Sequence, residues 1–207
     1  MNIIEEETLL SPTAAKEEAD KVLSLSNSFY ERGGNKFSTL GASAYLDSLN
    51  DYVEKYSETN PVIDANFSDL VAAARSKLSL LFNVPVVDMP NAGRVGFHVF
   101  DDRANGAQAD WHLDLAFQNV RWPEPFSSPF SFTVPLSLPD NIGGLDYVDE
   151  EGQEQYKPYT VGNIYISSGL FLHRIANPIP FKEGQNRITL QGHGALLSFS
   201  NTAVVYF

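Results

Sequence analysis

The first part of the chain carries apolar residues at mixed steps of three and four, a spacing that places them on one face of a helix. Residues 11–34 show this spacing, and they begin with a Ser-Pro pair and end with a Gly-Gly pair, which suit the two ends of a helix. The same spacing recurs in residues 40–58 and 66–83. The pattern therefore predicts a helical region over residues 1–83.

After residue 84 the pattern changes to short stretches of β-branched and aromatic residues, separated by turn-forming residues. Such stretches at near-regular spacing predict strands of a β-sandwich or open barrel. Helices followed by strands indicate an α+β protein whose helices support a sheet. We expect one domain over residues 1–207, with a helical support (1–83) and a β core (84–207).

Composition and charge narrow the class of function. The chain has 207 residues, of which 43% are hydrophobic and 12% aromatic, enough for a sizeable core. The formal charge of −12 argues against a non-specific grip on nucleic acid, because phosphates would be repelled. No apolar run reaches the length of a membrane span, and the acidic N-terminus does not resemble a secretory signal, so we expect a cytoplasmic protein.

The stretch "DWHLDLAFQNV" places His112 and Asp114 two residues apart in a strand-like run, so that both would point to one side. Such a pair arises readily by chance and is weak evidence by itself. A further histidine, His173, closes the strand-like run "GNIYISSGLFLH". With no cysteine in the chain, any metal must rely on His, Asp and Glu. Two imidazoles and a carboxylate suit non-heme Fe(II), and the same set could hold zinc.

The stretch "NRITLQGH" puts Arg187 and Thr189 on one face of a predicted strand. A buried arginine is costly unless it meets an anion, and its planar fork suits a carboxylate. The alternative is an arginine at a strand end whose charged head reaches solvent.

The ordered set of His112-x-Asp114, His173 and Arg187-x-Thr189 resembles the Fe(II)/2-oxoglutarate-dependent oxygenases, most closely their prolyl-hydroxylase-like branch. The Gly-Gly strand "NIGGLDYVD" falls between the first two parts, as in that branch. The resemblance covers residues 94–193. The connection from His173 to Arg187 is longer than in compact members. The resemblance implies a double-stranded β-helix (jelly-roll, cupin-like) core.

The resemblance also implies roles for individual residues. His112, Asp114 and His173 would hold Fe(II), and Arg187 with Thr189 would bind the distal carboxylate of 2-oxoglutarate, while O2 takes a remaining position on the metal. Halogenating relatives lack the carboxylate, so Asp114 favours hydroxylation, desaturation or ring closure.

Two other histidines fall where relatives line the pocket. His98 and His193 would contact the cosubstrate or the substrate; the alternative for each is a hydrogen-bonded core histidine.

We expect a dioxygenase that acts on a small molecule such as an amino acid or a natural-product intermediate, without a nucleic-acid or membrane partner. One alternative is a hydroxylase of protein or peptidyl side chains. Another is a non-catalytic cupin-like binding protein, but a bare metal binder would not need the anion clamp of Arg187 and Thr189.

Overall fold

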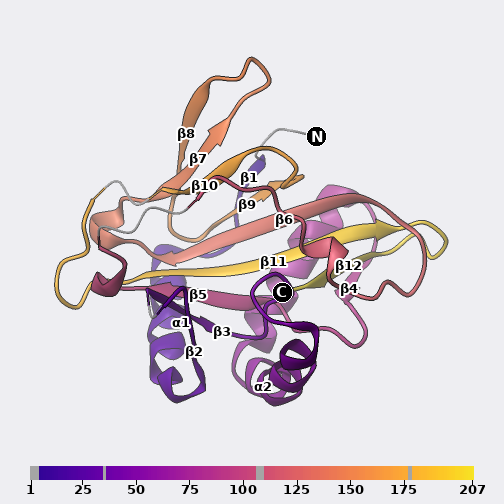
Figure 1. Ribbon diagram of the computed structural model, residues 1–207, viewed down its shortest axis with the longest axis horizontal. Helices are drawn as coiled ribbons and strands as arrows, with labels where there is room; N and C mark the ends of the chain where they lie inside the picture. The colour runs from indigo at the N-terminus through magenta and orange to yellow at the C-terminus, as the bar shows by residue number, and fades with distance from the viewer. Residues whose placement is uncertain (1–4, 35, 106–109, 177–178) are drawn as a thin grey trace.

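The structure is a computed structural model that describes residues 5–34, 36–105, 110–176 and 179–207. It consists mostly of antiparallel strands with two long helices (Figure 1). The elements are β1 (Glu5–Thr8), α1 (Pro12–Ser24), η1 (Ser26–Ser28), β2 (Tyr30–Arg32), β3 (Phe37–Leu40), α2 (Leu49–Phe82), β4 (Val86–Asp88), β5 (Gly96–Phe100), η2 (Asp102–Ala104), η3 (Ala116–Gln118), β6 (Phe126–Ser137), η4 (Pro139–Asn141), β7 (Gly144–Val148), β8 (Glu154–Pro158), β9 (Asn163–Ser167), β10 (His173–Ala176), β11 (Arg187–Leu197) and β12 (Ala203–Tyr206).

The larger sheet has the strand order β1-β9-β6-β11-β5-β3-β2, and β12 and β4 extend it beside β11. The long strand β11 pairs with β6 along one edge. Its other edge is divided, because its first part (187–191) pairs with β5 and its later part (193–196) pairs with β12. Of these pairings only that of β12 with β4 is parallel. The strand β11 is therefore the centre of the sheet.

A smaller sheet has the order β10-β7-β8. In Figure 1 its strands are at the top of the view, near β1 and β9, while α1 and α2 pass behind the larger sheet and extend below it. The larger sheet thus has one face covered by helices and the other turned toward the smaller sheet.

Strand alternation divides the side chains between these two faces. On β11, Ile188 and Leu190 belong to the main hydrophobic core, together with residues of α1 and α2 such as Val22 and Phe67. The residues that alternate with Ile188 and Leu190 along the strand face the smaller sheet. This second face is unusually polar for a buried surface, because it includes the buried residues His98, Ser131, Arg187, Thr189 and His193.

Residues 1–83 are not helical throughout, so this part of the prediction is wrong. The helix α1 has the expected Ser11 N-cap, whose side chain accepts from the N–H of Ala14, but it ends at Ser24. A Ser/Asn-rich stretch follows, and such residues compete with the helical hydrogen bonds. The Gly-Gly pair, with positive φ at both residues, connects β2 to β3 instead of ending a helix.

The two helices predicted between residues 40 and 83 are a single helix, α2, with non-helical backbone angles at Phe67. The buried stripe of this helix continues across the predicted gap, through Thr59 and Ile63. Residues 41–47 form a loop, buried over 41–44 and exposed at Tyr45 and Leu46, and not the start of a helix. The position of this loop bears on the candidate site.

Two strand predictions near the histidines need correction. Residues 110–120 contain only an isolated β-bridge, which joins His112 to His173, followed by η3. The run ending at His173 is also not one strand. It consists of β9 in the larger sheet, a connecting segment, and β10, which begins at His173 in the smaller sheet. The chain therefore crosses between the sheets just before His173.

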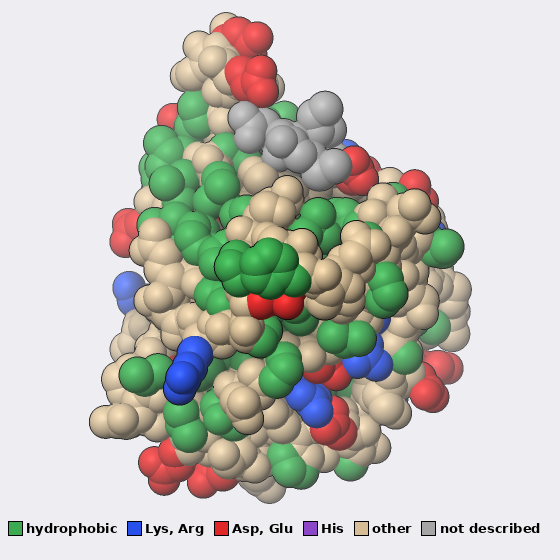
Figure 2. Space-filling model, turned by 90° about the vertical axis from the view of Figure 1, so that its right-hand side faces the viewer, with side chains coloured by type: hydrophobic (Ala, Val, Ile, Leu, Met, Phe, Trp, Pro, Cys, Tyr) green, Lys and Arg blue, Asp and Glu red, His purple; other side chains and the backbone are tan. Residues whose placement is uncertain are grey.

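The surface agrees with the acidic composition of the chain. On the face shown in Figure 2, basic side chains are scattered, some of them beside acidic ones, and no continuous basic area is seen. This face offers no extended surface for neutralising phosphates. Among the described helices, none is both long and apolar enough to cross a membrane.

Candidate functional site

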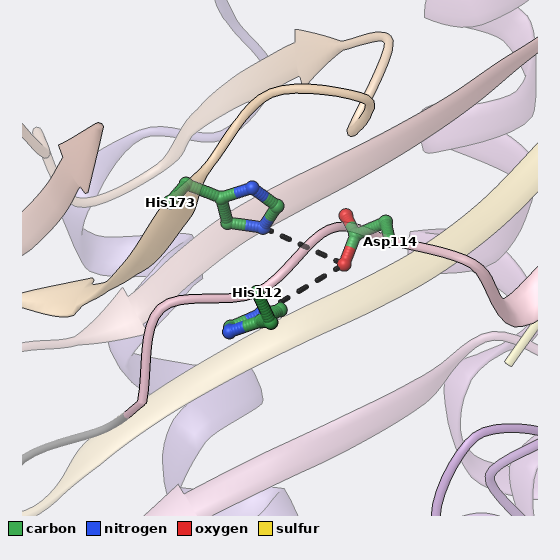
Figure 3. A group of neighbouring side chains, drawn as sticks. All are labelled: His112, Asp114 and His173. Atoms are coloured by element: carbon green, nitrogen blue, oxygen red, sulfur yellow. Dashed lines mark ion pairs between the residues drawn. The ribbon is translucent and has the colours of Figure 1, made fainter. Parts of the chain in front are cut away.

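His112, Asp114 and His173, here called the triad, come together where the chain crosses between the sheets (Figure 3). One ligand atom from each residue lies within 4.8 Å of the other two. Oδ1 of Asp114 lies 3.5 Å from Nε2 of His173 and 3.9 Å from Nε2 of His112. His173 is buried, whereas the side chain of His112 is 46% exposed, so the triad is open on one side.

Backbone hydrogen bonds explain why the triad forms outside a regular strand. His112 and His173 exchange two backbone hydrogen bonds of 3.0 Å each. The N–H of Asp114 then donates to the carbonyl of Gly169 at 2.8 Å. Both side chains of the H-x-D pair consequently lie on the same side, as expected, although no strand continues through them.

The two triad histidines have the same ring orientation. Nδ1 of His112 lies 2.8 Å from the carbonyl of Asp110, and Nδ1 of His173 lies 2.8 Å from the carbonyl of Phe171. A carbonyl can only accept, so Nδ1 carries the proton in both rings and Nε2 of the neutral imidazole keeps its lone pair. Such second bonds orient metal-ligating histidines.

Asp114 is held as a carboxylate. Burial alone would raise its pKa, but hydrogen bonding to His173 and the electrostatic influence of His193 and His173 outweigh burial, with a further hydrogen bond from Ser131. The pKa of Asp114 therefore lies well below its ordinary value. Ser131 also lies 2.9 Å from Nδ1 of His193, which links that histidine to the carboxylate.

The donor set fits a divalent metal ion. Nε2 of both histidines and the ionised Asp114 oxygen converge. Burial would lower the pKa of His173, but the hydrogen bond to Asp114 and the charge of Asp114 raise it, so without a metal a proton on Nε2 of His173 is favoured, and a bound cation would replace that proton. Three converging lone-pair atoms repel one another unless a cation or an added proton lies among them. Two imidazoles and one carboxylate leave coordination positions open, as non-heme Fe(II) sites do.

A cavity of about 540 Å³ lies between the two sheets and is lined by all three triad residues. Arg187, Thr189 and Tyr159 line it as well. Polar side chains thus occur at the triad and at the start of β11, within one cavity. The volume falls in the range of small-molecule sites.

Arg187 is only 2% exposed, so the alternative of a head reaching solvent is excluded. Its Nη1 donates to the carbonyl of Ala176 at 2.8 Å, and its Nη2 donates to the carbonyl of Gly144 at 3.1 Å. The guanidinium lies 5.5 Å from the centre of the Tyr159 ring. Burial lowers its pKa, but an arginine remains charged at neutral pH. The cavity therefore contains a fixed positive charge.

His98 and His193 are both buried on this face of the sheet, and each has a protein hydrogen-bond partner. Nε2 of His98 lies 2.7 Å from the hydroxyl of Tyr45, and His98 lines the cavity. His193 is hydrogen-bonded to Ser131, as described above, and lines a small recess that Asp114 also lines. A direct contact of either histidine with a cosubstrate or substrate stays a prediction.

Sequence reasoning missed three residues of this site: Tyr45, Ser131 and Gly169. Tyr45 lies in a segment that was interpreted as helix. A Cβ built on Gly169 would lie 2.6 Å from Cβ of Asp114 and 2.8 Å from Oγ of Ser131. Alternation along β6 would have placed Ser131 on the polar face, but nothing in the sequence connected it with Asp114.

No protein-family model and no curated protein matches the sequence. Solved structures do match the fold. An N-substituted L-amino acid dioxygenase from Burkholderia ambifaria AMMD, in complex with alpha-KG, has a TM-score of 0.57 at 8% identity, over 98% of this chain and 85% of that one. The alpha ketoglutarate dependent carbocyclase SnoK from nogalamycin biosynthesis has a TM-score of 0.54 at 10% identity, over 99% and 92%.

The alpha ketoglutarate dependent epimerase SnoN, from the same biosynthesis, has a TM-score of 0.53 at 13% identity, over 92% of this chain and 76% of that one. SnoK and SnoN are both described as non-heme proteins. At such low identities the likeness is one of fold. The chain therefore has the fold of the non-heme, α-ketoglutarate-dependent oxygenases.

Proposed function

We propose that the protein is an Fe(II)- and 2-oxoglutarate-dependent dioxygenase that oxidises a small molecule by hydrogen abstraction. The observation that carries this proposal is the convergence of three lone-pair atoms, from His112, Asp114 and His173, in the same cavity as a buried arginine. A metal binder without a cosubstrate does not need an anion clamp in this cavity. The fold shared with solved α-ketoglutarate-dependent enzymes supports the same conclusion.

Fe(II), 2-oxoglutarate and O2 together would supply the oxidising power, with succinate and CO2 as products. The triad would hold the metal through Nε2 of His112, Nε2 of His173 and Oδ1 of Asp114. The backbone carbonyls at Nδ1 of both rings would keep the lone pairs directed at it. With Asp114 present as a ligand, hydroxylation, desaturation or ring closure is favoured over halogenation.

Arg187 would bind the distal carboxylate of 2-oxoglutarate, and the hydroxyl of Thr189 would add one hydrogen bond. The bonds from Arg187 to the carbonyls of Ala176 and Gly144 fix the guanidinium before any ligand arrives. Because Arg187 is buried, little water competes for the guanidinium, and its attraction to the carboxylate is therefore strong.

The substrate would be a small molecule, such as an amino acid or a natural-product intermediate. The cavity volume of about 540 Å³ supports this size class. Two of the matching structures are described as an N-substituted L-amino acid dioxygenase and as a carbocyclase of nogalamycin biosynthesis. We further propose that the two facing sheets form a double-stranded β-helix core within a single domain over residues 1–207.

The cosubstrate assignment is tested by titrating 2-oxoglutarate into anaerobic, Fe(II)-loaded protein and following the visible charge-transfer band of a keto-acid chelate. Removing one partner of a desolvated charge pair costs about 2–5 kcal/mol, which is roughly a 30- to 5,000-fold loss of affinity. Arg187→Ala should therefore weaken 2-oxoglutarate at least about thirtyfold while Fe(II) affinity changes little. Thr189→Val should weaken it by about 0.5–1.5 kcal/mol.

Arg121→Ala is the matched control, because Arg121 is exposed and outside the cavity. Circular dichroism of each variant separates loss of binding from loss of the structural bonds of Arg187. Equal 2-oxoglutarate affinity in Arg187→Ala and Arg121→Ala would refute the cosubstrate assignment.

If zinc bound but no keto-acid band formed with Fe(II), the cupin-like alternative would take its place. A mass-spectrometric screen for +16 and −2 products over amino acids and metabolites would then identify the substrate.

A further inference from the structure

Tyr45 lies at the edge of the cavity, in the loop 41–47 that precedes α2. The residue is 37% exposed, and it lines the cavity. Its ring meets the ring of His98 edge-on at 6.2 Å and that of His193 at 5.3 Å between centroids. The negative charge of Asp114 is among the influences on its hydroxyl. Tyr45 is therefore a polar group near the metal end of the cavity.

The direction of the hydrogen bond between Tyr45 and His98 can be inferred from the other ring nitrogen. Burial lowers the pKa of His98 to about 3, so the ring is neutral and carries one N–H. Its Nδ1 is buried and has no hydrogen-bond partner among the described residues. A proton on Nδ1 would leave a buried donor unpaired, whereas a proton on Nε2 would leave only a lone pair unpaired. Unpaired donors are the rarer of the two in folded proteins, so Nε2–H donates to the Tyr45 oxygen.

The oxygen of Tyr45 accepts from Nε2–H of His98, so Tyr45 directs its own hydroxyl hydrogen elsewhere. Tyr45 lines the cavity, and the open side of its hydroxyl is therefore the cavity.

Asp47 fixes the loop that carries Tyr45. Its carboxylate is 1% exposed and accepts from both Nη atoms of Arg32, at 2.5 and 2.9 Å. It also accepts from Nζ of Lys55 and, at 2.8 Å, from the backbone N–H of Ser43. Bonds to β2, to α2 and within the loop make this a rigid anchor. The hydroxyl of Tyr45 is thus held in place before a ligand binds.

We propose that Tyr45 donates a hydrogen bond to the primary substrate, that His98 positions Tyr45 for this, and that the substrate carries an acceptor oxygen on the side facing loop 41–47. A carbonyl or carboxylate oxygen would serve. This deepens the proposed function and rests on it. The substrate is the expected partner because the ring of Tyr45 contacts that of His193 and its hydroxyl is influenced by the charge of Asp114, on the metal side of the cavity. His98, to which Tyr45 is hydrogen-bonded, lies opposite Thr189, so the 2-oxoglutarate affinity of Tyr45→Phe separates the two possible partners.

The first test requires neither metal nor substrate. Long-range proton–nitrogen correlation spectra of 15N-histidine-labelled, metal-free protein at pH 7 show which ring nitrogen is protonated, and His98→Gln assigns the signal. We expect His98 to carry its proton on Nε2. A proton on Nδ1 would overturn the proposal, because Tyr45 would then be a donor to His98. This result is independent of whether the protein is an oxygenase.

The second test measures binding of N-acetyl-L-amino acids, which carry amide and carboxylate acceptors, to protein loaded anaerobically with Fe(II) and 2-oxoglutarate. Calorimetry should give a panel member whose affinity falls about 2- to 12-fold in Tyr45→Phe, the loss expected for one neutral hydrogen bond. Tyr56→Phe, the same change at a residue outside the cavity, should have no effect. The affinities for Fe(II) and 2-oxoglutarate should change less than twofold.

His98→Gln retains an N–H donor for Tyr45 and should keep the affinity for this probe within about threefold, whereas His98→Leu should weaken it as Tyr45→Phe does. Equal losses in the two His98 variants would show that His98 has only a packing role. A panel that does not bind the wild type, equal binding by wild type and Tyr45→Phe, or a loss of 2-oxoglutarate affinity in Tyr45→Phe would each overturn the assignment of Tyr45 to the substrate.

Discussion

At the scale of single residues, Gly169 shows how closely the metal-ligand group is packed. Its φ is +67°, a conformation that costs little only for glycine. A Cβ at this position would lie 2.6 Å from Cβ and 2.8 Å from Oδ2 of Asp114. The absence of a side chain at Gly169 therefore leaves room for the carboxylate.

Gly169→Ala should reduce Fe(II) affinity about tenfold or more, because displacing a group that supports a ligand typically costs 10- to 100-fold. The matched control is Gly184→Ala, since Gly184 has a similar φ of +78° but no atom within 4 Å of its built Cβ. Both changes should lower the free energy of unfolding by about 1–3 kcal/mol through backbone strain. Anaerobic Fe(II) titration and urea unfolding measure the two effects, and equal Fe(II) affinities would contradict this role for Gly169.

At the scale of elements, β1 is attached to the sheet by a polar cluster around Glu6. The carboxylate accepts from Nζ of Lys157 at 2.6 Å, Nδ2 of Asn163 at 2.8 Å and the hydroxyl of Tyr165 at 2.7 Å. The hydrogen bond from Lys157 outweighs the opposing effect of burial, and together with the bonds from Tyr165 and Asn163 it lowers the pKa of Glu6 from 4.5 to about 2.

A carboxylate with a lowered folded pKa stabilises the fold at pH above its unfolded pKa, and the stabilisation is lost as pH falls toward the folded value. Glu6→Gln should therefore lower the free energy of unfolding by about 1 kcal/mol at pH 7. The difference in the free energy of unfolding between Glu6→Gln and the wild type should shrink as the pH falls from 4.5 to about 2. Urea unfolding across this range measures it. Glu5→Gln removes the same charge from the same strand, and an identical effect there would point to net charge instead of the cluster.

The sequence allowed the polar face of β11 to be predicted, because strict alternation separates Arg187 and Thr189 from Ile188 and Leu190. The H-x-D pair was also correctly paired with His173, although neither lies in the strand that was expected. Local spacing was sufficient for β11 and for the H-x-D pair, whereas the grouping with the distant His173 rested on the ordered set that resembles a known family.

The loop around Tyr45 could not be predicted in this way. Its apolar spacing is compatible with a helix, but Asp47 bonds Arg32 and Lys55, and these long-range contacts override the local pattern. The partnership of Ser131 with Asp114 likewise depends on how distant segments meet. Local periodicity contains no information about either contact.

At the scale of the whole molecule, the triad joins the segment before η3 to the smaller sheet, so metal binding should stabilise the entire fold. A ligand at 100 times its dissociation constant adds about 2.7 kcal/mol, which for a domain of this size is roughly 5–10 °C in Tm. Anaerobic thermal unfolding with Fe(II), and again with excess EDTA, measures the shift. The double variant His112→Ala/His173→Ala should show none; a shift of equal size would place the metal elsewhere.

The central position of β11 has a consequence for how the protein is made. This strand fills the space between β6 on one side and β5 and β12 on the other, yet both β5 and β6 precede it in the chain. Until residues 187–197 emerge, β5 and β6 each present an unpaired edge and the core lacks Ile188 and Leu190. Unpaired edges of this kind invite aggregation of nascent chains. A chain that stopped short of β11 would lose the middle of its sheet, while a chain that lost β1 would lose only an edge.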